Sequence, residues 1–295
     1  MSWLIVGTVT YEEFPLLLGR CSLENGTLNV GGKAVPVARG TPALISAAVL
    51  AAQLLQTEPP TALLAGDTGK GRGSERIYGH LVNTLPGLSD SLIVFHYLQP
   101  DIDWHNRILL GLQEMRDRPT LVADAGYMYV AKMSGFADSY DLFTPDIGEL
   151  AFLADESAPH PFYTRGFLLQ EEDKAEELVE RAYEHQNAAR YLLVKGKCDL
   201  VASADGILAR IHEPCVENME PIGGTGDTLT GIVAALIQSG KPIAEAATLA
   251  AASNRFMGLL SNPTPAFSVS DLLPRLADAV TEAVKSSSSH VIEPL

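Results

Sequence analysis

The sequence predicts an α/β fold with a largely parallel central sheet, and three observations support this. The expected strands are apolar along their whole length, as parallel strands are when helices cover both faces of a sheet. They alternate with helical segments at the spacing of βαβ units. The chain has 295 residues, of which 46% are hydrophobic, enough for one large core. Because no repeat or interdomain linker is evident, we expect a single domain over residues 1–285 and a disordered tail over 286–295.

Each element rests on a local pattern. In chain order, the expected strands are the apolar runs 1–10 (MSWLIVGTVT), 61–65 (TALLA), 91–98 (SLIVFHYL), 120–123 (TLVA), 141–144, 191–195 (YLLVK) and 200–203. The expected helices are 41–56, 74–84, 104–116, 174–183, 226–239, 243–260 and 271–284. Thr41 and Pro42 suit the N-cap and first turn of the first helix. The glycine-spaced segment 25–40 is expected to form a hairpin or a loop.

Charge and cysteine content narrow the functional classes. Lys and Arg total 21 against 36 Asp and Glu, a net charge of −15, which disfavours a nucleic-acid groove or an anionic membrane face. Three scattered cysteines predict neither a disulfide framework nor a zinc cluster and suit a reducing cytosol. The longest apolar stretch, residues 43–55, is too short to span a bilayer, and the N-terminus lacks the basic region of a signal peptide. We therefore expect a cytoplasmic enzyme that acts on a small molecule and binds neither nucleic acid nor membrane.

The segment Gly223–Gly231 (GGTGDTLTG) is the most informative stretch. Its glycines permit a turn whose N–H groups point the same way, and the helix that begins near Gly226 adds its positive dipole end. Such a turn forms an anion hole for a transferring phosphoryl group. Asp227 falls in the first helical turn, where it can act as general base toward an attacking hydroxyl. The alternative is a glycine turn with Asp227 as a helix cap.

Other candidates follow from the position of strand ends. Ligands of open parallel sheets bind beyond the carboxyl ends of the strands, which directs attention to Asp67, Asp124, residues 144–149 and Lys195. The glycine-rich loop 66–73 fails the P-loop spacing, so a surface loop is weighed there against an anion site.

The end of the strand over 91–98 leaves a choice of its own. His96 and Tyr97 either line a substrate pocket or belong to the core.

The run Gly224–Gly231 resembles the Gly-x-Gly-Asp signature of ribokinase-like kinases, and most of all that of nucleotide-dependent NAD(P)H-hydrate dehydratases. Thr144–Glu149 (TPDIGE) is similar to their Thr-Pro-His-Pro-Gly-Glu, and Val194-Lys195-Gly196 to their Lys-Gly strand end. Gly40-Thr41-Pro42 resembles their Gly-Ala-Pro. The resemblance implies a ribokinase-like three-layer α/β/α sandwich with ATP or ADP as phosphoryl donor. In the dehydratases, a hydroxyl of the hydrated nicotinamide ring is phosphorylated, and phosphate then leaves.

The resemblance also implies residue roles. The donor phosphates would meet the amides of Gly224, Thr225 and Gly226, and Asp227 would contact the acceptor hydroxyl. The remaining implied residues are Lys195 and Gly196 in the nucleotide pocket, Thr41, Asp124 and Asp146 on the substrate side, and Glu149 as the acid that organises Mg²⁺. Two carboxylates near a triphosphate favour a divalent cation, since they would otherwise repel the donor. The alternative for Asp146 and Glu149 is a capped helix start on the surface.

Three departures concern the acceptor side. Asp146 stands where the dehydratases have the His that contacts the substrate, and Gly126 replaces the second acid of their Asp-Ala-Asp. The segment 94–99 lacks the glycines of their Gly-Pro-Gly-Leu-Gly.

Three hypotheses remain: an NAD(P)H-hydrate dehydratase-like lyase, a kinase of the same fold that acts on a sugar or vitamin precursor, and a non-catalytic ligand-binding relative. Retention of Asp227 argues against the third. Because ribokinase-like relatives are often oligomeric, we also expect a homo-oligomer.

Overall fold

The computed structural model describes residues 2–156 and 174–287. Its strands are β1 (Leu4–Val9), β2 (Leu17–Glu24), β3 (Thr27–Val30), β4 (Lys33–Val35), β5 (Thr61–Gly66), β6 (Leu92–His96), β7 (Thr120–Ala123), β8 (Leu142–Phe143), β9 (Tyr191–Val194), β10 (Asp199–Ser203) and β11 (Gly206–Ile211). Its α-helices are α1 (Thr41–Leu54), α2 (Arg72–Thr84), α3 (Ile102–Gln113), α4 (Gly126–Met133), α5 (Ile147–Ala154), α6 (Ala175–Glu184), α7 (Thr225–Gln238), α8 (Ile243–Ser261), α9 (Val269–Leu272) and α10 (Leu276–Ser287).

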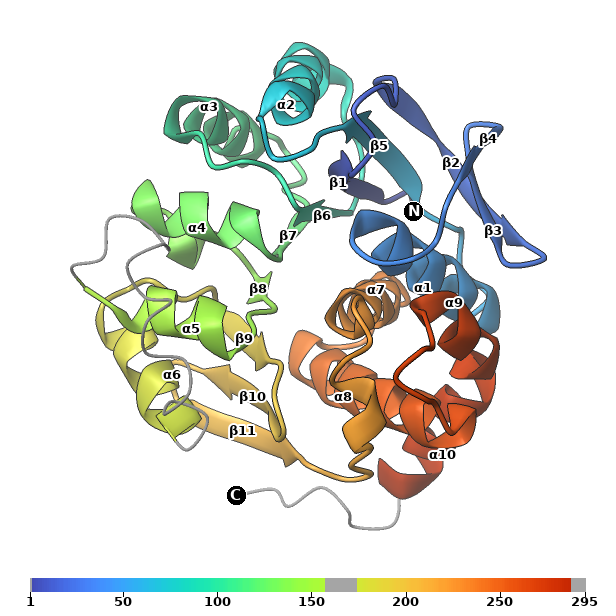
Figure 1. Cartoon of the computed structure of the whole chain (residues 1–295). Coiled ribbons are helices and arrows are strands. Elements are labelled where there is room, and N and C mark those ends of the chain that lie inside the picture. The colour runs from blue at the N-terminus through green and yellow to red at the C-terminus, as the bar shows by residue number, and fades with distance from the viewer. Residues whose placement is uncertain (1, 157–173, 288–295) are drawn as a thin grey trace.

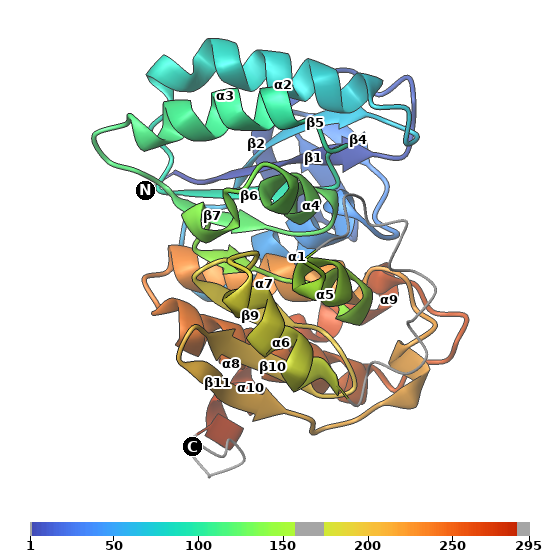
Figure 2. The same cartoon turned by 90° about the vertical axis from the view of Figure 1, so that its left-hand side faces the viewer.

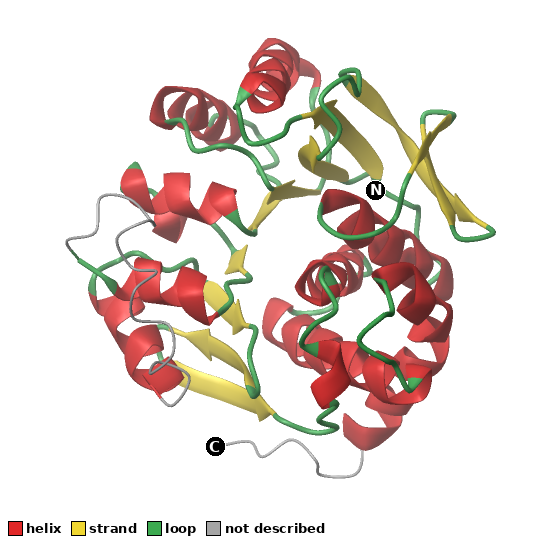
Figure 3. Cartoon of the chain, viewed as in Figure 1, coloured by secondary structure: helices red, strands yellow, loops and turns green. Residues whose placement is uncertain are grey.

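The strands of the described residues form one sheet in the order β11-β10-β9-β8-β7-β6-β1-β5-β2-β3-β4. The central strands are, in sheet order, β5, β1, β6, β7, β8 and β9, and they pair in parallel. Antiparallel pairs add β2, β3 and β4 at one edge of the sheet and β10 and β11 at the other. The largely parallel sheet is therefore confirmed, and its antiparallel extensions are hairpins (Figure 3).

Helices cover both faces of the sheet (Figure 1). One core packs α1, α7, α8 and α10 against the side chains on one face, such as Ile5 and Val94. The other packs α2, α3, α4, α5 and α6 against the alternate side chains, such as Val6 and Phe95. Figure 2 shows the sheet between these two layers from the side of α4, α5 and α6. Alternation along fully buried strands thus gives a three-layer α/β/α sandwich.

Several local expectations need correction. Thr41 is the first residue of α1 and not its N-cap, which is Gly40. The helix α4 was not predicted; it follows Ala125, whose positive φ of 52° no sequence pattern announces. The strand β11 was also not predicted. The helix α10 runs to Ser287, past the expected end of the domain at 285, and residues 288–295 of the expected tail lie outside the described residues.

In the described part of the chain, no helix combines the length and the hydropathy that a membrane crossing needs.

Candidate active site

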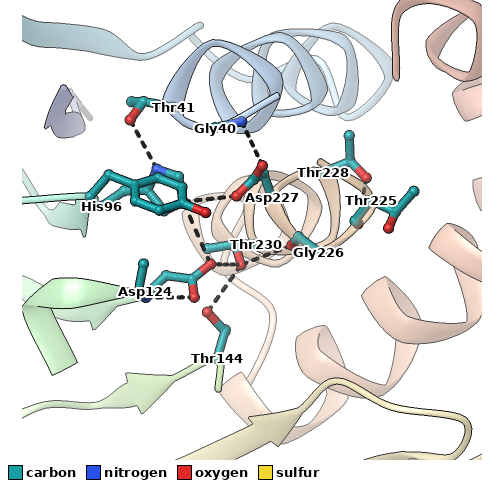
Figure 4. Close-up of polar contacts among 12 residues, drawn as sticks. Gly40, Thr41, His96, Asp124, Thr144, Thr225, Gly226, Asp227, Thr228 and Thr230 are labelled. Carbon is teal, nitrogen blue, oxygen red and sulfur yellow. Dashed lines mark hydrogen bonds and ion pairs between the residues drawn. The ribbon is translucent and has the colours of Figure 1, made fainter. Parts of the chain in front are cut away.

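The candidate site lies where four neighbouring parallel strands end. His96 is the last residue of β6, Asp124 directly follows β7, Thr144 follows β8 and Lys195 follows β9. These strands are adjacent in the sheet, so their carboxyl ends meet along one edge. The N-terminus of α7, in the helical layer that also contains α1, α8 and α10, lies beside this edge, so Asp227 is next to the strand ends (Figure 4). The rule that ligands bind at the carboxyl ends of parallel strands therefore identified residues that are far apart in the sequence and close together in the fold.

Both carboxylate oxygens of Asp227 are held. The backbone N–H of Gly40 donates to Oδ2 at 2.6 Å, and Nε2 of His96 lies 3.0 Å from Oδ1. Burial alone would raise the pKa of Asp227, but the interactions with His96, Lys195 and the Gly40 amide outweigh it and lower the pKa. Because its pKa is lowered, the carboxylate is ionised at neutral pH. Its side chain keeps 10% of its surface exposed, so solvent can still reach it.

His96 connects Asp227 to the start of α1. Its Nδ1 lies 2.9 Å from Oγ1 of Thr41, and its ring is fully buried. Thr41 therefore does not cap its own helix but orients the imidazole. The buried ring agrees with the core interpretation of His96, and its contact with Asp227 leaves a role in the substrate pocket as a prediction. No sequence pattern shows which face of a strand its last residue uses when both faces are buried.

Asp124 and Lys195 form a buried ion pair beside Asp227. Nζ of Lys195 lies 2.9 Å from Oδ1 of Asp124, and Oγ1 of Thr230 donates to Oδ2 at 2.6 Å (Figure 4 draws the contact with Thr230). Burial alone would lower the pKa of Lys195, but the negative charges of Asp124 and Glu149 more than offset it and raise the pKa. Lys195 is therefore a permanent positive charge at the site.

Sequence reasoning did not identify Thr230, although its spacing from Asp227 carries a signal. Residues three apart share a helix face, so Asp227 and Thr230 both face the strand ends. Thr230 also contacts Thr144, with 3.0 Å between the two hydroxyl oxygens.

The start of α7 fits a phosphate group. Its first intrahelical amide bond is from Thr228 to the carbonyl of Gly224, so the N–H groups of Thr225, Gly226 and Asp227 precede the helical ladder. No side chain of the described residues caps the helix. Gly224 has a φ of 100°, a conformation that L side chains rarely adopt. A Cβ on Gly226 would lie 3.2 Å from Cδ and 3.5 Å from Nζ of Lys195, so a larger residue would crowd the gap between the amides and the ammonium group.

Asp146 and Glu149 lie at the rim of the site and form a capping box at the start of α5. The N–H of Glu149 donates to Oδ1 of Asp146 at 2.7 Å, and the N–H of Asp146 donates to Oε2 of Glu149 at 2.8 Å. Partial burial raises the pKa of Glu149 to about 8, against the opposing charge of Lys195. Each carboxylate uses one oxygen in the box and keeps a second oxygen, which is the type of ligand that Mg²⁺ takes. The capped helix start is confirmed, and a metal role stays a prediction.

Gly196, the remaining predicted site residue, is exposed beside Lys195, and its N–H donates to Oδ1 of Asp199 at 3.0 Å. By contrast, the backbone amides in the loop 66–73 already have an acceptor within the chain. The carboxylate of Asp67 already accepts the N–H groups of Gly69, Lys70, Gly71 and Ser74, all at 3.0 Å. The backbone of this loop therefore offers no amide cradle at these positions, which favours the surface loop. An anion site formed by the side chains of Lys70 and Arg72 stays a prediction.

Comparisons with known proteins agree with the fold. A ribokinase-like superfamily protein from Enterococcus faecalis aligns over 96% of this chain and 87% of its own, with a TM-score of 0.57 and 15% identity. A pyridoxal kinase from Entamoeba histolytica aligns over 100% and 99%, also with a TM-score of 0.57 and 15% identity. At this identity the likeness shows the fold alone, which is ribokinase-like.

Sequence comparisons give the family. The chain is 38% identical over 224 residues to an uncharacterized protein from Methanocaldococcus jannaschii, a match that covers 76% of this chain and 92% of that one. It is 29% identical over 137 residues to a bifunctional NAD(P)H-hydrate repair enzyme from Pyrobaculum aerophilum, covering 46% of this chain but only 24% of that enzyme. The family model for NAD(P)H-hydrate dehydratase matches residues 100–281, which include Asp124, Lys195 and the run before α7. The chain therefore belongs to the NAD(P)H-hydrate dehydratase family.

Proposed function

We propose that this protein transfers a phosphoryl group from ATP or ADP to a hydroxyl of a small molecule, and that elimination of phosphate follows, as in an NAD(P)H-hydrate dehydratase. One observation carries the proposal: an ionised, partly exposed carboxylate adjoins three helix-start amides and a buried lysine. Asp227 would bind the acceptor, the amides of Thr225 and Gly226 the donor phosphates, and Lys195 would balance their charge. The cytoplasmic location and the oligomeric state stay predictions.

The residues of the chain account for the opening step. Asp227 takes the proton of the acceptor hydroxyl while the hydroxyl oxygen bonds to the terminal phosphorus. The bond from that phosphorus to the bridging oxygen breaks, and its electron pair stays on the departing nucleotide. The Gly40 amide and His96 keep the carboxylate of Asp227 in place, so little reorganisation is needed during the transfer.

Nucleotide and Mg²⁺ enter as bound groups. The nucleotide supplies the phosphoryl group, and Glu149 with Asp146 would hold Mg²⁺, which neutralises charge on the phosphates. Support for the nucleotide comes from fold relatives, since a Staphylococcus aureus pyridoxal kinase in complex with AMP-PCP and pyridoxal aligns over 86% of this chain at a TM-score of 0.52 and 13% identity. The open helix start and Lys195 are the features of this chain that suit the same kind of ligand.

The alternative is a kinase that leaves the phosphate on its acceptor. The observation that favours it is the end of β6, where Tyr97 adopts a positive φ of 52° and exposes 49% of its surface. Its ring lies 3.8 Å from the position that a Cβ on Gly40 would take, next to the amide that holds Asp227. A side chain as large as tyrosine at this point shapes the acceptor side differently from a glycine loop.

One assay separates the two outcomes. The protein is incubated with hydrated NADH and either ATP or ADP in the presence of Mg²⁺, and absorbance at the reduced-nicotinamide band is followed. Return of the band, dependent on nucleotide and absent in Asp227→Asn, supports the dehydratase. No return, together with nucleotide-dependent phosphorylation of another alcohol in a metabolite panel, supports the kinase. No transfer to any acceptor would contradict both.

A further inference from the structure

The two halves of the candidate nucleotide site come from separate elements. The open amides belong to α7, whereas Lys195 belongs to the strand end after β9. Asp124 links them through side chains, because it contacts both Lys195 and Thr230 of α7. The helix α8 adds a second link, which acts on the backbone of both elements.

Asn254 on α8 holds the start of α7. Oγ1 of Thr228 donates to Oδ1 of Asn254 at 2.8 Å, and Nδ2 of Asn254 donates to the carbonyl of Thr225 at 3.1 Å. The amide side chain therefore fixes the first turn of α7 without covering its open N–H groups.

The next residue, Arg255, holds the strand end that carries Lys195. Its Nη2 donates to the carbonyls of Gly196 and Lys197 at 2.9 and 2.8 Å, and its Nε donates to Oδ2 of Asp199 at 2.7 Å. Asp199 in turn accepts the N–H of Gly196 at 3.0 Å. Arg255 thus bonds the carbonyls of Gly196 and Lys197, and Asp199 bonds the N–H of Gly196.

The ion pair between Arg255 and Asp199 also carries a desolvation cost. The side chains of Arg255 and Asp199 keep only 11% and 8% of their surface exposed, and burying an ion pair gains stability only when its hydrogen bonds are well satisfied. Nη1 of Arg255 makes one further bond, to the carbonyl of His212 at 3.0 Å. The planar, forked guanidinium group suits this set of acceptors, which a lysine ammonium group cannot match.

We propose that Arg255, together with Asp199, is a positioning residue that sets Lys195 against the donor phosphates held at the start of α7. The inference rests on the proposed function. Arg255 touches neither reactant, and it acts through the backbone of Gly196 and Lys197. A displacement of Lys195 by about 1 Å is enough to weaken its charge contact with a phosphate group.

The test compares nucleotide binding in three variants by calorimetry with ATP and Mg²⁺. Arg255→Lys keeps the charge but loses the fork, and Asp199→Asn keeps an acceptor for the Gly196 amide but loses the charge. The matched control is Ser253→Ala, because Ser253 is buried two positions before Arg255 on α8 and, among the described residues, its hydroxyl bonds within the helix, to the carbonyl of Leu249. Circular dichroism and the melting temperature establish that each variant is folded at the temperature of the titration.

We expect Arg255→Lys to weaken nucleotide binding by up to about tenfold, no more than loss of the Lys195 charge itself would, and Asp199→Asn by a smaller factor. The KM for the acceptor should stay unchanged in both, which a general loss of structure would not produce, and Ser253→Ala should bind as the wild type does. Equal affinity in a folded Arg255→Lys variant and in the control would overturn the role of Arg255 and leave the proposed function standing. If the first variant does not fold, an unchanged affinity in folded Asp199→Asn overturns it in the same way. A wild-type protein that binds no nucleotide would overturn both.

Discussion

Two glycine-rich segments of this chain lead into helices, and they differ in what their backbone amides bind. Before α2, the carboxylate of Asp67 accepts four backbone N–H groups and the hydroxyl of Ser74. Before α7, no side chain in the described ranges 2–156 and 174–287 caps the helix, and Asp227 bonds the Gly40 amide and His96 instead. Glycine content predicts a turn in both places, but the position of the carboxylate decides whether the amides are free for a ligand.

The placement of the two acids explains the difference. Asp67 precedes its loop, so its side chain lies inside the turn that follows and takes the place of an anion. Asp227 is the third residue of its helix, and its side chain is directed to the Gly40 amide and His96 instead of the amides of its own turn. The carboxylate of Asp67 thus stabilises the loop before α2, whereas the amides before α7 stay available to a ligand.

Replacement of Asp227 tests the second loop with the largest expected effect. Asp227→Asn keeps the size of the side chain but cannot take a proton, so we expect turnover to fall by about 100-fold or more with nucleotide affinity nearly unchanged. Steady-state kinetics and calorimetry on the same preparation measure both quantities. An equal loss of nucleotide affinity would mean that Asp227 supports the fold of the loop and not the chemistry.

Replacement of Asp67 tests the first loop. Asp67→Ala removes the common acceptor of five hydrogen bonds and leaves donors unpaired, so we expect the free energy of unfolding to fall by about 2–3 kcal/mol. Urea denaturation measures this loss, and nucleotide affinity below the melting temperature should not change. Weaker nucleotide binding in the folded variant would show that the loop serves the site after all.

Lys195 provides a smaller and more specific test of the second loop. Lys195→Met keeps the length of the side chain and removes its charge, so we expect nucleotide affinity to fall by about tenfold, or roughly 1.4 kcal/mol. The acceptor KM should change little. A change confined to the acceptor KM would move Lys195 from the nucleotide side to the acceptor side.

The smallest expected effect is the pH dependence of the first loop. Burial alone would raise the pKa of Asp67, but the hydrogen bonds from Ser74, Gly71 and Gly69 outweigh it and lower the pKa. A carboxyl whose pKa is lower in the folded state contributes stability above its unfolded value and loses it as the pH falls through the folded value. The urea midpoints of wild type and Asp67→Asn should therefore differ most near neutral pH, and the difference should shrink as the pH falls below the ordinary pKa of an aspartate. A gap that stays constant over this range would contradict the lowered pKa.

The sequence predicted the parts of this site that depend on short-range pattern. The strand ends, the turn before α7 and the capping signal at Asp146 and Glu149 all follow from local rules, and the parallel sheet then brings Asp124, Lys195 and Asp227 together. These are features in which neighbouring residues alone fix the geometry.

The parts that were missed depend on contacts across the chain. The role of His96 needs Thr41 on one side and Asp227 on the other, at sequence separations of 55 and 131. The Gly40 amide bonds Asp227 across 187 residues, and Gly40, not Thr41, is the N-cap of α1. In the same way, only the folded chain shows that Asp67 fills its own loop.

The most direct test compares the two loops in one experiment. A ¹⁵N-labelled sample is titrated with a non-hydrolysable ATP analogue and Mg²⁺, and the amide resonances of residues 69–71 and 225–227 are followed. Our account predicts large shifts at Thr225, Gly226 and Asp227 and none at residues 69–71, whose amides are bound to Asp67. Shifts at residues 69–71, or a saturating titration that leaves residues 225–227 unmoved, would contradict it.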